Sequence, residues 1–247
     1  MAKEFEVDTG GTLTTSLQAY YKAEDVTEYY TGGGTLDLTN NNTVAFNAAK
    51  IDNGADGGTT NTNKSLSIAN NLGIDGGACS ISFWVKINTE VAAGTYGLVC
   101  CASSGTDVLY FVRYDYNAGT RRLRFFRVKQ NVAVTASAYT VTLVTTNWYH
   151  VVLTYDTTNI KGYVNNIQQG ADTAASGTGS GQTSAFIILG DNSGDGSTIA
   201  NFASAIVDEV GIWSKALSTN EITDLYNSGN GQTMVEVSTF KPQVIII

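Results

Sequence analysis

An acidic residue inside an apolar strand is the first feature of this sequence that could do chemistry. The segment 203–213 (ASAIVDEVGIW) has the period-two alternation of a β-strand, which predicts one shared face for four residues: Ile206, Asp208, Val210 and Ile212. An ionised carboxylate on an apolar face is costly unless a partner satisfies it. Asp208 is therefore a candidate metal ligand, a candidate catalytic acid or a structural residue with a buried partner.

A hydrolytic site would need more than this one acid. Glycoside hydrolases use two carboxylates, ~5–5.5 Å apart in retaining enzymes and farther apart in inverting ones. Asp208 and Glu209 are adjacent, so alternation predicts opposite faces for them, and the chain has no Glu-x-Asp-x-Glu series. His150, the only histidine, shares a strand face with Trp148 and Val152, where we expect a structural role. The sequence therefore predicts no catalytic residues.

Two acidic turns match the first half of an EF-hand-type calcium loop. The turn at 191–196 (DNSGDG) offers three candidate metal ligands: Asp191, Ser193 and Asp195. Its twelfth position is Phe202, where the bidentate glutamate would stand. The turn at 52–57 (DNGADG) offers two similar ligands: Asp52 and Asp56. Because Asp and Asn also form such turns without metal, we expect no required cofactor, with Ca²⁺ as the one candidate.

The basic segment 113–129 (RYDYNAGTRRLRFFRVK) is the most unusual charge feature. It holds six of the fourteen Lys and Arg residues of an acidic chain. Alternation puts Arg122 and Arg124 beside Phe126 on one face, and Leu123 and Phe125 beside Arg127 on the other.

The tip of this segment supplies the candidate binding residues, which are Tyr114, Asp115, Tyr116, Asn117, Arg121, Arg122 and Arg124. Aromatic rings beside planar hydrogen-bonding groups suit saccharides, and guanidinium groups suit anionic sugars or an acidic subunit surface. The alternative is a solvated hairpin whose arginines keep a sheet edge from aggregating.

The composition indicates the elements that must position these residues. The 247 residues include 26 glycines and one proline, as expected for many strands joined by tight turns. Strand-like segments recur at 44–47, 65–69, 79–87, 96–101, 107–114, 121–129, 132–136, 139–145, 147–156, 159–165, 183–190 and 203–213. This spacing predicts an all-β protein, an antiparallel two-sheet jelly-roll sandwich. The net charge of −8 argues against a nucleic-acid partner.

One helix is well signalled near the end of the chain. Ser218 and Glu221 form a capping-box pattern, and Gly229 is placed to end the helix. Three residues share its apolar face: Ile222, Leu225 and Tyr226. We expect this helix to pack back onto the sandwich, with Asp208 as a clasp between the last strand and the helix.

The cysteines and the chain ends lead to further predictions. Cys79 is predicted to be a buried free thiol, with a Cys79–Cys100 bridge as the open alternative. No apolar run is long enough for a membrane span, and the amino terminus has no secretory pattern. We expect an arm at 1–16, one domain at 17–232 and an apolar β tail at 233–247 that pairs with a neighbouring subunit.

Six segments occur in the order seen in laminin-G-like, concanavalin A-like jelly-roll domains: LQAYYKAED, CSISFWVKI, NWYHVVLTYD, KGYVNNIQ, AFIILGDN and IVDEVGIWSKALSTNEITDLYNSG. The last segment, with Asp-Glu-Val, an aromatic residue and a short acidic helix, also resembles pentraxin relatives. The resemblance covers about residues 17–230 and implies two curved antiparallel sheets. It also implies structural roles for Asp208 and Trp213.

Members of this family mostly bind glycans, proteins or other subunits, often with calcium at one rim, although some glycoside hydrolases share the fold. The module is frequent in phage virion proteins. The resemblance therefore implies a non-catalytic structural or adhesion module in a virion, of decoration or tail-fibre type. Its expected partners are virion subunits or a second copy, held through the tail, and a cell-surface glycan. The alternatives are a secreted, extracellular lectin and, behind it, a glycoside hydrolase.

Overall fold

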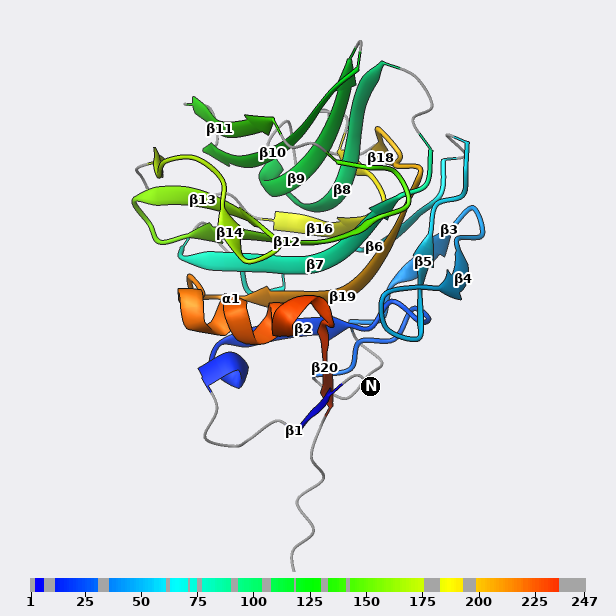
Figure 1. Cartoon of the computed structure of the whole chain (residues 1–247), viewed down its shortest axis with the longest axis horizontal. Helices are drawn as coiled ribbons and strands as arrows, with labels where there is room; N and C mark the ends of the chain where they lie inside the picture. The colour runs from blue at the N-terminus through cyan, green and yellow to red at the C-terminus, as the bar shows by residue number, and fades with distance from the viewer. Residues whose placement is uncertain are drawn as a thin grey trace, which may run out of the picture.

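A computed structural model shows two antiparallel β-sheets packed face to face, with one short helix near the C-terminal end (Figure 1). The predicted all-β sandwich is therefore confirmed. The structure describes residues 3–6, 12–30, 36–60, 63–70, 72–74, 77–89, 93–103, 108–117, 119–129, 133–140, 143–175, 183–192 and 199–235.

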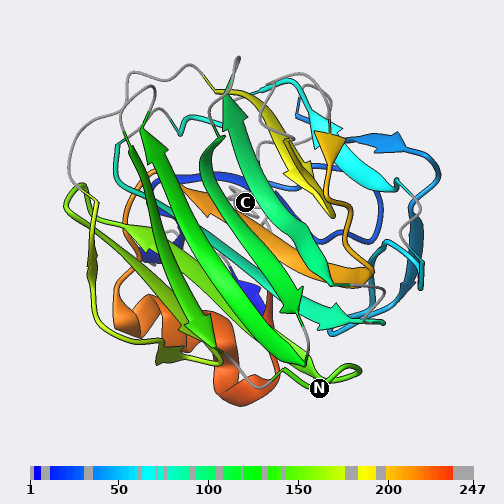
Figure 2. The ribbon, with the colours of Figure 1, turned by 90° about the horizontal axis from the view of Figure 1, so that it is seen from above.

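The seven-stranded sheet carries the basic hairpin. In spatial order its strands are β11 (Ala133–Thr140), β10 (Thr120–Lys129), β9 (Val108–Asn117), β8 (Gly94–Ser103), β16 (Thr183–Ile188), β6 (Ser65–Ile68) and β3 (Thr39–Asn41). Every neighbouring pair is antiparallel. Figure 2 looks onto this sheet from above, with β9 and β10 side by side.

The nine-stranded sheet lies below it. Its path is β14 (Ile167–Gln168), β13 (Asn159–Val164), β12 (Trp148–Tyr155), β7 (Cys79–Ile87), β19 (Ala205–Trp213), β5 (Asn53–Asp56) and β4 (Ala45–Ala48). Two further strands attach at the side: β15 (Thr173–Ala174) pairs with β13, and β2 (Leu17–Tyr21) pairs with β19. A separate small ribbon joins β17 (Asp191–Asn192) to β18 (Ile199–Ala200).

The main core fills the space between the sheets because alternate residues of each strand point inward. Phe83 and Val85 of β7 belong to it, as do Leu123 and Phe125 of β10. A second, smaller core lies on the outer face of the nine-stranded sheet. There Trp213 packs with residues of α1 (Thr219–Tyr226), of the short helix η1 (Thr12–Thr14) and of the chain-end strand β20 (Gln232–Val235).

Helix α1 begins as predicted. The Ser218 hydroxyl accepts a hydrogen bond from the Glu221 backbone N–H, and the Glu221 carboxylate accepts one from the Ser218 N–H at 2.8 Å. The helix ends earlier than predicted, at Asn227 with φ 46°, and Gly229 instead ends the short helix η2 (Asn227–Gly229). Asparagine tolerates the left-handed conformation. No helix in the described part of the chain is long and apolar enough to cross a membrane.

Two strand predictions were wrong. Where the sequence predicted two strands, at 132–136 and 139–145, the described residues Ala133–Thr140 form the single strand β11, because continuous pairing with β10 overrides the weak strand preference of serine and alanine. The acidic turn at 52–57 contains strand β5, which pairs with β4.

The two chain ends meet beneath the nine-stranded sheet. Strand β1 (Lys3–Glu6) pairs in parallel with β20 (Figure 1). The start of the predicted tail, 233–235, therefore pairs within its own chain, and its pairing with a neighbouring subunit stays a prediction. The rest of that tail, 236–247, lies outside the described residues.

Candidate functional site

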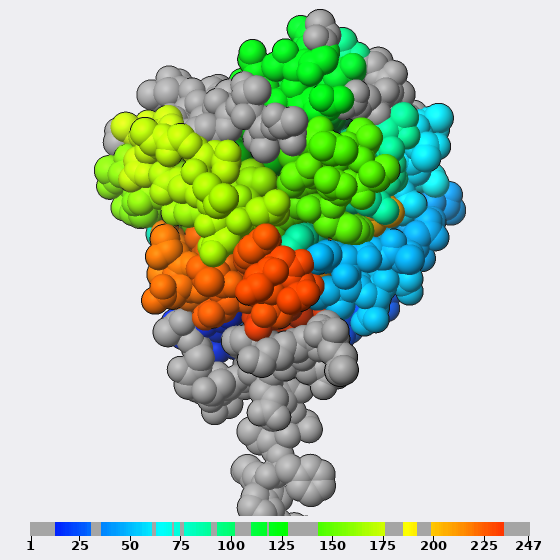
Figure 3. All heavy atoms as spheres, in the orientation of Figure 1, coloured from blue at the N-terminus to red at the C-terminus, as the bar shows by residue number. Residues whose placement is uncertain are grey.

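The register of the β9–β10 hairpin divides the predicted binding residues between two faces. Asp115 pairs with Arg122, and Tyr116 pairs with Arg121. Asp115 and Arg122 therefore lie on the outer face of the sheet, as does Arg124. The hairpin forms the top of the molecule in Figure 3.

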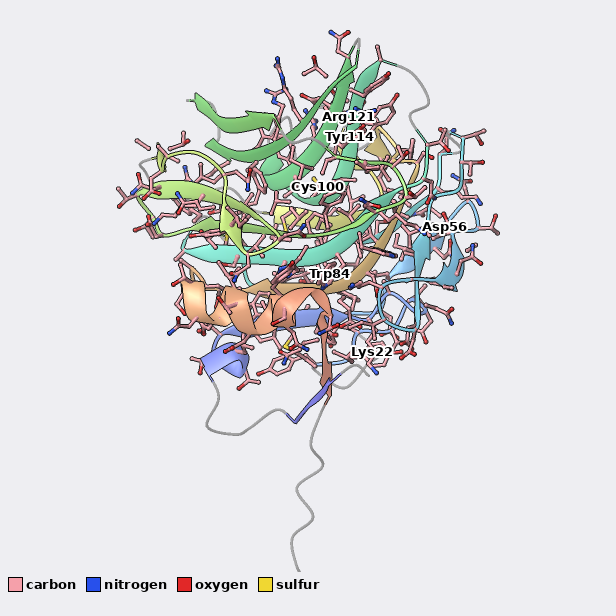
Figure 4. The ribbon with its side chains drawn as sticks, viewed as in Figure 1. Lys22, Asp56, Trp84, Cys100, Tyr114 and Arg121 are labelled. Carbon is pink, nitrogen blue, oxygen red and sulfur yellow. The ribbon has the colours of Figure 1, made fainter. Side chains whose placement is uncertain are left out.

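The aromatic residues of the hairpin tip, which we expected to contact a saccharide, turn inward. Tyr114 is 3% exposed, belongs to the main core and stacks on Tyr96, with 6.4 Å between ring centroids (Figure 4). Tyr116 is half-buried against the same core, and the Arg121 guanidinium lies over its ring at 5.9 Å. Of the two rings, only that of Tyr116 is on a partly exposed residue.

A pocket of about 410 Å³ opens at the hairpin tip. Its lining is Ala93, Gly94, Thr95, Asp115, Tyr116, Asn117, Thr120 and Arg122. The structure thus brings together four of the predicted residues. Sequence reasoning missed the other four, which are Ala93, Gly94, Thr95 and Thr120. The two from β8 reach the pocket only because β8 pairs with β9, with Thr95 opposite Asp115.

Two arginines of the outer face form ion pairs with acidic residues of the same chain. Arg113 forms an ion pair with Asp191, and Arg124 forms one with Asp115 at 3.2 Å. Their guanidinium groups also lie 4.4 Å and 4.3 Å from the rings of Phe111 and Phe126, respectively.

These two phenylalanine rings stack on each other at 4.1 Å within a small outer apolar cluster that includes Cys100 and Ile187. Arg124, a predicted ligand residue, therefore helps cover this cluster and neutralise Asp115. The inward Arg127 is 3% exposed and lies over the Tyr155 ring at 4.3 Å.

The predicted calcium ligand Asp191 is already occupied by protein groups. One carboxylate oxygen pairs with Arg113, and the other accepts a hydrogen bond from the Asn201 amide at 2.8 Å. Burial raises the pKa of Asp191, while the Arg113 pairing opposes that rise. Arginine thus stands where a metal ion would bind, so Asp191 does not fit a calcium site. The other two ligands, Ser193 and Asp195, lie outside the described residues.

The second acidic turn is likewise satisfied by protein donors. Both oxygens of Asp56 accept hydrogen bonds from the side-chain amides of Asn47 and Asn88, each at 2.8 Å. Asp52 is exposed at the turn before β5. Within the described residues, no three side chains of His, Cys, Asp or Glu come together as a metal site would need. The three cysteines are free and buried, so the Cys79–Cys100 bridge is not formed.

A β-bulge in β19 changes the face on which its acids lie. Asp208 pairs with Trp84 and Gly211 pairs with Ser82, so β19 has one residue more than β7 between these points. The bulge contains Glu209, whose φ is 53°. Beyond it the alternation reverses, and Val210 points into the main core. The predicted shared face of Ile206, Asp208, Val210 and Ile212 was therefore wrong.

Both acids of this bulge are enclosed beneath covering segments. The Asp208 carboxylate accepts a hydrogen bond from the Ile51 backbone N–H at 2.8 Å, so its partner is the turn before β5 and not the helix. Glu209 accepts a hydrogen bond from the Thr233 hydroxyl at 2.8 Å, on the side where β20 lies. The prediction that these acids take opposite faces does not hold. Burial raises the pKa of each to about 8.

The structure also brings Ser82 beside His150, with 2.8 Å between Oγ and Nε2. Serine next to histidine is a pairing used in nucleophilic catalysis. Each of the two is 2% exposed, and the His150 ring lies against Trp84 and Tyr226 (Figure 4). Its Nδ1 has no hydrogen-bond partner among the described residues, and burial lowers its pKa to about 3. The pair is closed to substrate, in keeping with the structural role predicted for His150.

Trp213, the other predicted structural aromatic residue, is fully buried, and its indole N–H donates to the Leu13 carbonyl at 2.6 Å. This bond ties β19 to η1 near the N-terminus. Trp213 thus anchors the second core, as the family resemblance implied.

A match to a protein-family model over residues 56–223, more than half of the chain, decides the family. The chain belongs to the concanavalin A-like lectin/glucanases superfamily. The matching model is that of a laminin G-like domain, which confirms the resemblance carried by the sequence motifs. No curated protein matches the chain in sequence.

Solved structures share the fold at low sequence identity. Domain 4 of AbnA, a GH43 extracellular arabinanase from Geobacillus stearothermophilus solved with arabinotriose, is 18% identical, with a TM-score of 0.63 over 85% of this chain and 97% of that domain. The binding domain of Paraclostridial Mosquitocidal Protein 1 is 15% identical, with a TM-score of 0.66 over 88% of this chain and 53% of that one.

The Botulinum neurotoxin serotype D binding domain is 14% identical, with a TM-score of 0.61 over 87% of this chain and 51% of its own. The chain thus spans about half the length of these two toxin domains. The family is of the lectin type, and these structural relatives are mostly binding domains.

Proposed function

We propose that this chain is a non-catalytic adhesion module that binds a glycan in the pocket at the β9–β10 tip. The observation that carries the proposal is the pocket itself. Its volume of about 410 Å³ lies within the ~300–1,000 Å³ typical of small-ligand sites. Its walls offer hydroxyl, amide, carboxylate and guanidinium groups from Thr95, Asn117, Asp115 and Arg122. Sugar hydroxyls both donate and accept hydrogen bonds, so such mixed donors and acceptors suit them.

Two further observations support binding without catalysis. The acids of β19 and the Ser82–His150 pair, the described groups that most resemble catalytic machinery, are buried away from the pocket. Several structural relatives are binding domains by name, and one was solved with arabinotriose. Their low identity carries over no site, so the proposal rests on this chain's own pocket.

A glycan array followed by calorimetry tests the proposal. We expect the full chain to bind at least one glycan and a variant with Asn117→Ala and Thr120→Ala to lose that binding. Asn53→Ala is the matched control, because Asn53 is exposed on the other sheet. Melting temperatures of all variants should agree. The proposal fails if the chain binds no glycan, or if the pocket variant and the control bind equally.

The setting we propose is a phage virion, with the chain as a decoration or tail-fibre protein that assembles with neighbouring subunits or with itself. The pairing of β1 with β20 favours assembly at the chain ends, because each of these strands has one edge without a strand partner among the described residues. An edge of this kind can accept a strand from another chain, and we expect a neighbouring copy to supply that strand from its apolar segment 244–247 (VIII). The alternative is a secreted lectin.

Truncation tests the assembly proposal. Removing 236–247 is cleaner than removing 234–247, because Met234 packs in the second core and its N–H donates to the Tyr20 hydroxyl at 3.1 Å. We expect the shorter chain to lose assembly in light scattering and to keep its melting temperature. Normal assembly of the truncated chain would rule out this role. Recovery of the chain in purified virions, as opposed to the secreted fraction, separates the two settings.

A further inference from the structure

We propose that the pocket at the β9–β10 tip selects acidic sugars, and that Arg122 determines this selectivity by pairing with the sugar carboxylate. The proposal rests on the proposed glycan binding and names the class of glycan that the pocket would take.

The arginines of this chain are concentrated in one place. All five arginines of the chain lie in this one hairpin. Arg113 and Arg124 are held in ion pairs and over phenylalanine rings, and Arg127 is buried over Tyr155. Arg121 lies over the Tyr116 ring. Four of the five guanidinium groups are therefore engaged within the protein.

Arg122 differs from the other four arginines. Its side chain is exposed, it lines the pocket, and no hydrogen bond or ion pair holds it within the described part of the chain. A guanidinium group binds a carboxylate through two parallel N–H donors, which gives both strength and orientation. The pocket thus presents an open anion-binding group at its wall.

The neighbouring Asp115 would repel an acidic ligand if its negative charge were free. Its Oδ2 is paired with Arg124 at 3.2 Å, so the positive charge of Arg124 offsets its negative charge. Its Oδ1 is buried. Asp115 therefore does not oppose an acidic ligand with a free charge, and it leaves Arg122, opposite it in the register, available to a sugar carboxylate.

The overall charge of the protein does not favour acidic ligands. With a net charge of −8, the protein as a whole does not attract anions. A preference for acidic glycans would have to arise from a local contact, because screening limits longer-range attraction to within ~8–10 Å.

The experiment compares each acidic glycan with its own neutral form. Uronic-acid and sialic-acid glycans are printed beside the same glycans with the carboxyl converted to an amide, which separates the two sources of a sugar carboxylate. We expect the full chain to prefer the acidic member of at least one pair by roughly tenfold or more, as expected for a charge-assisted bidentate bond. Arg122→Gln should bring that ratio close to one.

Lys64→Gln is the matched control, because it removes the same charge from a site outside the pocket, and it should keep the ratio. If acidic and amidated glycans bind equally to the full chain, or if Arg122→Gln keeps the preference, the selectivity proposal is wrong while glycan binding stands. If no glycan of either kind binds, both proposals fall.

Discussion

The two buried acids of the β19 bulge make the stability of this protein depend on pH in an unusual direction. Burial raises the pKa of Asp208 and Glu209 to about 8, while the hydrogen bonds from Ile51 and Thr233 oppose that rise. A carboxyl group with a raised folded pKa keeps its proton in the folded state and loses it in the unfolded state. Its contribution to stability is therefore fully present below pH ~4 and is lost as the pH rises towards 8.

In the window of pH 6.5–7.5 these two groups dominate the pH dependence. Burial lowers the pKa of His150 to about 3, so His150 works in the opposite direction while the unfolded chain still binds its proton, and this effect fades above pH ~6.5. Within the window, each acid lowers the free energy of unfolding by roughly 1 kcal/mol per pH unit, and the two together give a slope of roughly 2 kcal/mol per unit.

Asp208→Asn should halve this slope. The asparagine carbonyl can still accept the Ile51 N–H, and the neutral amide has no proton to lose. Urea unfolding at pH 6.5, 7.0 and 7.5 measures the slope, with the buried Trp84 and Trp213 as fluorescence probes. Asp208→Asn with Glu209→Gln should abolish the fall in stability with rising pH, while Asp224→Asn on the exposed face of α1 should keep it. A flat profile for the unmodified chain, or one slope common to all variants, would refute the reasoning.

Three further predictions follow from single contacts. Asp208→Ala should lower the free energy of unfolding by roughly 1–3 kcal/mol, because the Ile51 N–H loses its acceptor. The folded fraction should still bind ligand, and lost binding at an unchanged melting temperature would contradict this prediction. Ser218→Ala should cost about 1 kcal/mol in urea unfolding by removing the cap of α1, whereas Ser218→Asp should largely retain it. A chelator should leave the melting temperature and glycan binding unchanged, because Arg113 occupies Asp191; a calcium-reversible fall would argue for a metal site.

Local patterns were sufficient for many of the elements. The strand Cys79–Ile87 was predicted with both bounds correct, and Trp148–Tyr155 within one residue at each end, because period-two alternation and β-branched residues act over a few neighbours. The capping box of α1 was likewise readable, since its two partners stand three residues apart. The ordered motifs then indicated the family, which the family-model match confirmed.

The candidate site depended on contacts that no local pattern contains. The sequence placed Asp115, Asn117 and Arg122 at a hairpin tip, but only the pairing of β8 with β9 brought Thr95 to the same pocket. Similarly, Asp191 looked like a metal ligand until the fold put Arg113, 78 residues away, against its carboxylate.

The sequence by itself therefore determined that this chain forms a lectin-type β-sandwich with one capped helix, because those signals arise between residues close together in the chain. Only the tertiary structure decided which side chains face the solvent, the core or one another. One extra residue in β19 reversed the alternation, so that Val210 and Ile212 face the main core while Asp208 lies on the outer face of its sheet. A bulge follows from the pairing of β19 with its neighbours, and strand pairing is set by the whole sheet.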